Sequence, residues 1–144
     1  MVESDTIKLL RECDAGVKMG VKSIEDVIPS VKSESLRTML CDSKCDHEEL
    51  GREIRAHLDE LGDDGKKPNT IATGMSAIKT NLKLAMKESD KTVASLMTDG
   101  CNMGTKSLSR YLNQYEAADE FSKDIAKKLI HLEESLAENI RGYL

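Results

Sequence analysis

Aromatic and chain-breaking residues are scarce in this chain of 144 residues. It has no Trp, one Phe, three Tyr, two Pro and nine Gly. Sandwiches and barrels of β-strands need frequent turn residues and strands rich in aromatic or β-branched side chains, so this composition argues against both. Long apolar runs are also missing, and no stretch approaches the roughly 20 residues of a membrane-spanning helix. Because 39% of the residues are still hydrophobic, the chain can build a core, and we expect an all-α domain.

The net charge of the chain limits the kinds of molecule that it can bind. A formal net charge of −5 argues against nucleic-acid binding, which needs a basic face. The first residues, MVESDTIKLL, lack the basic and then apolar pattern of a secretory signal, so we expect a cytoplasmic protein with mostly reduced cysteines. Cys41 and Cys45 are four residues apart on one expected helix face. They could bind a metal there, or act as small apolar residues.

Apolar residues recur every three or four positions, which predicts helices over about 3–28, 31–61, 70–87, 89–115 and 117–142. Pro29 should end the first helix, and the stretch GDDGKKPN at 62–69 should end the second. The short link between the first two helices predicts that they pack antiparallel. Four lysines spaced four residues apart run along the exposed side of the expected helix 70–87 and into the next helix: Lys79, Lys83, Lys87 and Lys91. Such a row indicates a solvated face, or else a docking surface for an acidic partner.

The two halves of the chain repeat each other. ESDTIKLLRECDAGVKMGVKSI, from Glu3, corresponds to ESDKTVASLMTDGCNMGTKSL, from Glu88. The Met-Gly pairs 19–20 and 103–104 correspond as well, and we expect them to permit close approach of helices. We therefore predict one domain over 1–144, with a hairpin at 3–61, a crossover at 62–88 and a hairpin at 89–144. Its four main helices form a bundle in which the second and third run parallel.

Duplicated hairpins joined by a crossover resemble the ferritin-like superfamily, and the motifs CDAGVKMGVKSI, GCNMGTKSLSRYLNQY and KKLIHLEESLAENIRGYL are similar to a small bacterial family of unknown function within it. The resemblance implies a ferritin-like four-helix bundle whose crossover holds an extra short helix. Ferritin-like di-iron proteins carry Glu on two helices and Glu-x-x-His on the other two. The matching positions are Glu48 and Glu134, both without the histidine, and Asp14 and Asp99 as the shorter carboxylates. The implied cofactor is iron or another divalent metal.

Polar residues interrupt the apolar stripes near the middle of each expected hairpin. Asp14 and His47 are almost equally far from a turn near Pro29 or Ser30, so we expect them in one layer, and Asp99 with Glu133 or Glu134 in the same layer. A buried carboxylate is costly unless it is paired or bound to a cation. Three interpretations stay open: Asp14 and His47 pair with each other, the layer binds a divalent metal, or it supplies a catalytic acid and base. The candidate ligands are Asp14, His47, Glu48, Asp99, Glu133 and Glu134.

Motifs of other chemistry are absent, including phosphate-binding loops, dinucleotide fingerprints and His-Glu-x-x-His. Two hypotheses for the function follow. The first is a non-enzymatic bundle that acts through self-association or a protein partner, with a symmetric homodimer as the expected assembly. The second is a divalent-metal protein, an iron carrier or a di-iron oxidoreductase with a degraded ligand set.

Overall fold

The computed structural model describes residues 4–63 and 89–144. Four long helices account for most of them: α1 (Asp5–Val27), α2 (Glu34–Glu60), α4 (Ser89–Gln114) and α5 (Glu120–Asn139), with short 3-10 turns at Ile28–Ser30 and Arg141–Tyr143. These residues contain no strand, so the all-α prediction is confirmed. The helix expected over 70–87 and the lysines at 79, 83 and 87 lie outside the described residues.

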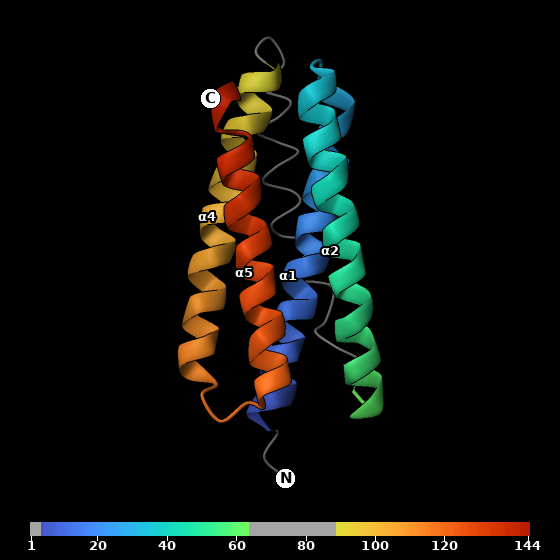
Figure 1. The fold of residues 1–144 in the computed structure, drawn as a ribbon, viewed down its shortest axis with the longest axis vertical. Helices are drawn as coiled ribbons and strands as arrows, with labels where there is room; N and C mark the ends of the chain where they lie inside the picture. The colour runs from blue at the N-terminus through green and yellow to red at the C-terminus, as the bar shows by residue number, and fades with distance from the viewer. Residues whose placement is uncertain (1–3, 64–88) are drawn as a thin grey trace.

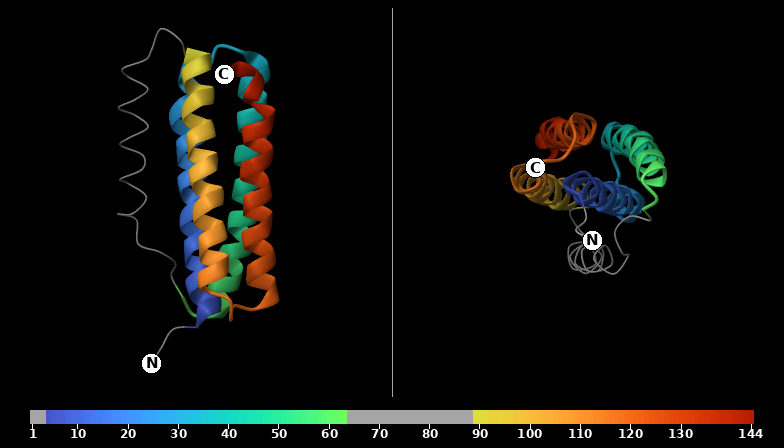
Figure 2. Two further views of the ribbon diagram at one scale, coloured as in Figure 1. Left: turned by 90° about the vertical axis from the view of Figure 1, so that its left-hand side faces the viewer. Right: turned by 90° about the horizontal axis from the view of Figure 1, so that it is seen from below.

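The four helices lie side by side as a bundle (Figure 1). Seen in that view, α1 runs upward, α2 and α4 both run downward, and α5 runs upward again, so the prediction of parallel second and third helices is confirmed. Four pairs of neighbours pack together: α1 with α2, α4 with α5, α2 with α5, and α1 with α4. Helix α1 also contacts α5 across the diagonal. The end-on view shows these positions (Figure 2).

Side chains fix where the helices begin. The hydroxyl of Ser33 accepts a hydrogen bond from the Leu36 amide at the start of α2, and the Asp119 carboxylate accepts one from the Ser122 amide at the start of α5. Such caps satisfy amides that have no partner within the helix. The Asp90 carboxylate accepts from the backbone amides of Lys32 and Ser33. It thereby joins the start of α4 to the start of α2.

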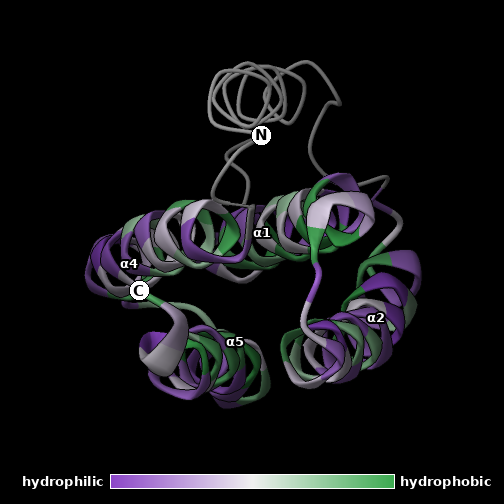
Figure 3. Ribbon diagram, turned by 90° about the horizontal axis from the view of Figure 1, so that it is seen from above, coloured by the Kyte–Doolittle hydropathy of each residue, from purple (hydrophilic) through white to green (hydrophobic). Residues whose placement is uncertain are grey.

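The ribbon coloured by hydropathy shows hydrophobic residues on all four helices (Figure 3). The buried apolar side chains form two separate clusters. The first lies toward the N-terminal end of α1 and includes Leu10, Leu50, Ile54, Leu108, Ile125 and Leu129. The second lies toward the opposite end and includes Ile24, Leu36, Leu40, Met97, Leu136 and Ile140. All four helices contribute positions between the two clusters. We call four of these positions, which lie against one another, the polar layer: Gly20, His47, Gly104 and Glu133. On α2 the buried Ser43 lies beside this layer.

Candidate functional site

A histidine and a glutamate meet at the centre of the polar layer. His47 Nε2 lies 2.9 Å from Glu133 Oε1, and His47 Nδ1 lies 2.7 Å from the carbonyl oxygen of Ser43, one turn earlier on α2. His47 is 1% exposed and Glu133 is 8% exposed. Both ring nitrogens thus face acceptor oxygens, and only an imidazolium can donate to both at once. The geometry fits a buried ion pair between α2 and α5.

The electrostatics agree with this geometry. Burial is the largest influence and acts to lower the pKa of His47, but the hydrogen bond and the charge of Glu133, the Ser43 carbonyl and the charge of Asp46 together raise that pKa above its usual 6.5. Cys101 on α4 is also buried beside Glu133. The pKa of the Cys101 thiol is raised, mainly by burial. The negative charge of Glu133 and a hydrogen bond to its carboxylate raise it further. The thiol therefore stays protonated and donates a hydrogen bond to the Glu133 carboxylate.

The glycines of the polar layer make room for this pair. A Cβ atom on Gly20 would lie 2.9 Å from His47 Cδ2 and 3.0 Å from His47 Nε2, so α1 can approach α2 this closely only with glycine there. A Cβ atom on Gly104 would lie 3.5 Å from Glu133 Cδ, an ordinary contact. The prediction of close approach is confirmed for Gly20, and at Gly104 the space would admit alanine. Met103 is 67% exposed and fills no gap.

Asp14 lies elsewhere in the bundle. Its carboxylate accepts from Lys18 Nζ at 2.9 Å and from Arg55 at 3.0 and 3.2 Å. The interpretation that Asp14 and His47 pair with each other is therefore wrong, as is their placement in one layer. The link between α1 and α2 runs to Ser33 and includes a 3-10 turn, so the chain folds back later than Pro29. Consequently His47 lies opposite Gly20 rather than Asp14.

Three of the candidate ligands lie on the surface. Glu48, Asp99 and Glu134 are all exposed, and Glu133 alone represents α5 in the polar layer. The prediction that Asp99 lies in the bundle's middle is wrong. Five residues separate Asp99 from Gly104, whereas six separate Asp14 from Gly20. One residue fewer turns a helix by about 100°, so Asp99 leaves the buried face that Asp14 occupies.

The residues do not fit a di-iron or other divalent centre. Both oxygens of Asp14 already accept from Lys18 or Arg55, and both nitrogens of His47 face oxygens. Over 4–63 and 89–144, no group of three or more His, Cys, Asp or Glu side chains is arranged to hold a metal ion. The four cysteines are free; Cys41 is half-buried and Cys45 is exposed. Burial raises the pKa of Cys13 to about 12.

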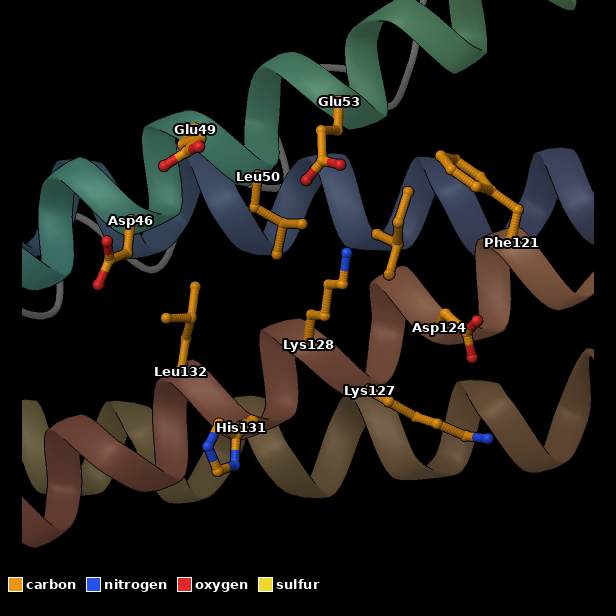
Figure 4. Close-up of a pocket in the computed structure, with 11 residues that line it drawn as sticks. Asp46, Glu49, Leu50, Glu53, Phe121, Asp124, Lys127, Lys128, His131 and Leu132 are labelled. Carbon is orange, nitrogen blue, oxygen red and sulfur yellow. The ribbon is translucent and has the colours of Figure 1, made fainter.

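An open groove of about 680 Å³ runs along the surface between α2 and α5 (Figure 4). Leu50, Ile125 and Leu132 form its floor. Acidic residues of α2 line one wall, and mostly basic residues of α5 line the other: Asp46, Glu49 and Glu53 against Lys127, Lys128 and His131, with Asp124 as the acidic exception. The sequence alone did not predict this groove or the contact between Cys101 and Glu133. The separation of 86 residues that relates Leu50 to Leu136 also relates His47 to Glu133, so the sequence marks these two residues as counterparts in the repeats but does not show that they are in contact.

Comparisons with family models, curated proteins and solved structures found no match for this chain. Among the described residues, no helix is both long and apolar enough to cross a membrane. What the chain does must therefore be argued from its own geometry.

Proposed function

We propose that this chain is a ferritin-like four-helix bundle without a catalytic or metal centre, which acts by associating with other protein chains, copies of itself included. The observation that carries the proposal is that the two buried acidic residues, Asp14 and Glu133, already have cationic protein partners. A buried carboxylate that lacked a partner would call for a cation. Asp14 has two cationic partners, and Glu133 has His47.

The bundle's topology supports the ferritin-like part of the proposal. Helices α2 and α4 run parallel, so the end of α2 and the start of α4 lie at opposite ends of the bundle, as in ferritin-like folds with one long crossover. The four positions of the polar layer also fall at corresponding places in the two sequence repeats.

The surface supports the association part. The α2–α5 groove combines an apolar floor with charged walls, and interfaces between proteins have an apolar centre with a polar rim. Phe121, at one end of the groove, is 46% exposed although it is a large apolar residue. Together with the apolar floor, the ring of Phe121 adds to the apolar surface that a partner could cover.

The competing hypothesis is a divalent-metal protein. One observation favours it: an imidazole, a carboxylate and a thiol meet at His47, Glu133 and Cys101. A metal ion there would have to displace the protons that join these groups.

Elemental analysis of protein purified without added metal or chelator tests the proposal, together with melting followed by circular dichroism. We expect no stoichiometric metal, and no rise in melting temperature with Fe²⁺, Mn²⁺ or Zn²⁺, because a ligand stabilises a protein only if it binds the folded state. Stoichiometric metal that is lost on substitution of Asp14→Asn, Glu133→Gln or Cys101→Ser would refute the proposal. Asp99→Asn, on the exposed face of α4, is the matched control.

A further inference from the structure

We infer that the α2–α5 groove is the contact surface of a symmetric homodimer, in which the acidic wall of each copy meets the basic wall of the other. The inference rests on the proposed function, because it names the partner through which the bundle acts. Its basis is the separation of charge between the two walls of one groove, which makes the surface complementary to itself.

The walls carry opposite charge along most of their length. Figure 4 shows Glu49 and Glu53 along α2, and Lys127 and Lys128 along α5. All four residues are exposed. In the part of the chain that the structure describes, the ion pairs at α2 and α5 involve other residues, such as His57 with Glu60 and Lys123 with Glu120. The charges of the groove are thus available to a second chain.

The register of the helices makes the match specific. His47 and Glu133 are in contact, so they mark one height on the antiparallel helices α2 and α5. Counting outward from this contact, residue 49 is level with 131 and residue 53 is level with 127. Glu53 therefore has Lys127 at its own height on the other wall, and Glu49 has His131, whereas Asp46 is level with Glu134.

A two-fold axis parallel to the helices, placed over the groove, uses this register directly. It lays α2 of one copy on α5 of the other without changing any height, so Glu53 of each copy faces Lys127 and Lys128 of the other. A two-fold axis across the helices would lay α2 on α2 and bring acidic residues together. Charge complementarity fixes orientation in this way, and a two-fold interface repeats every contact twice.

Two double variants of the full chain test the inference by light scattering and sedimentation. Glu49→Lys with Glu53→Lys makes both walls basic, and Lys127→Glu with Lys128→Glu makes both walls acidic. We expect the wild type to be dimeric at micromolar concentration. Each variant alone should dissociate, with a dissociation constant at least about thirty-fold higher, because like charges then face each other across the axis. An equimolar mixture of the two variants should form a heterodimer, since its walls are complementary again.

The control variant is Glu48→Lys with Asp59→Lys, which changes the charge of α2 equally at exposed residues outside this groove. It should dimerise like the wild type, and circular dichroism should show all variants folded. A monomeric wild type, or variants that dimerise as tightly as the wild type, would overturn the inference. Either result leaves binding of a different protein open, whereas stoichiometric metal in the elemental analysis would refute the proposed function itself.

Discussion

Removal of either member of the buried His47–Glu133 pair should cost far more than removal of both. In Glu133→Leu the imidazole of His47 keeps its hydrogen bond to the Ser43 carbonyl oxygen, but Nε2 has no acceptor. In His47→Leu the Glu133 carboxylate keeps only the Cys101 thiol. Because both side chains are almost fully buried, water cannot replace the lost partner.

The expected magnitude follows from that burial. Breaking a buried pair by removing one partner costs about 3–5 kcal/mol, whereas replacing both partners by apolar residues is often neutral or stabilising. We expect each single variant to lose about 3 kcal/mol. The double variant should lie within about 1 kcal/mol of the wild type, because two leucines would join the apolar clusters on either side of the layer. The loss in the double variant would then be far smaller than the sum of the two single losses, which is the coupling expected of two residues that stabilise each other.

The assay is urea unfolding followed by circular dichroism at neutral pH, since the chain has no Trp to report its unfolding by fluorescence. Leu50→Ala with Leu136→Ala, two buried positions in separate clusters, serves as the control in which the single losses should add. Additive losses at positions 47 and 133 would refute the ion pair. They would show that each side chain contributes through packing alone.

Two further predictions follow from the same layer. The pKa of His47 is raised on folding, so its contribution is complete below the unfolded value of about 6.5 and is lost as the pH rises through the folded value. The free energy of unfolding should therefore fall as the pH rises above about 6.5. Urea midpoints of His47→Leu measured across the same pH range should lack this slope. Gly20→Ala should destabilise the fold by about 1–3 kcal/mol, because its Cβ would press on the buried ring. Gly100→Ala, at an exposed helical position with open space around it, should stabilise by about 0.5–1 kcal/mol; equal effects of the two substitutions on the melting temperature would contradict the close approach.

The helices and their order could be predicted because apolar periodicity, Pro29 and the short hairpin link are local signals. The pairing of the polar residues could not, because it depends on the height at which one helix passes another. The link between α1 and α2 sets that height. Because the link includes a 3-10 turn, Asp14 lies level with Arg55 on α2 and not with His47. One contact of Asp14 could nonetheless be read from the sequence. Lys18 follows it by four residues, the spacing at which opposite charges on a helix attract.

The groove escaped prediction for a different reason. On each helix taken alone, Glu49 with Glu53, and Lys127 with Lys128, have the pattern of an ordinary solvated face. The two rows form a groove only because α2 packs beside α5, which places the acidic row of one helix next to the basic row of the other. Contacts between the two hairpins, unlike those within a hairpin, have no short-range signal in the sequence.

The choice of residues at positions 47 and 133 explains how a polar layer can survive in this core. The positions are separated by 86 residues, like Leu50 and Leu136 or Ile54 and Ile140, so they are counterparts in the two repeats. Counterparts that meet at the centre of a bundle would, if identical, bring two like charges together, and two carboxylates so close cannot both ionise. A histidine opposite a glutamate turns that repulsion into attraction, and the thiol of Cys101 satisfies Glu133 further. The layer is therefore balanced in charge without a metal ion, and the chemistry open to other molecules lies on the surface of the bundle.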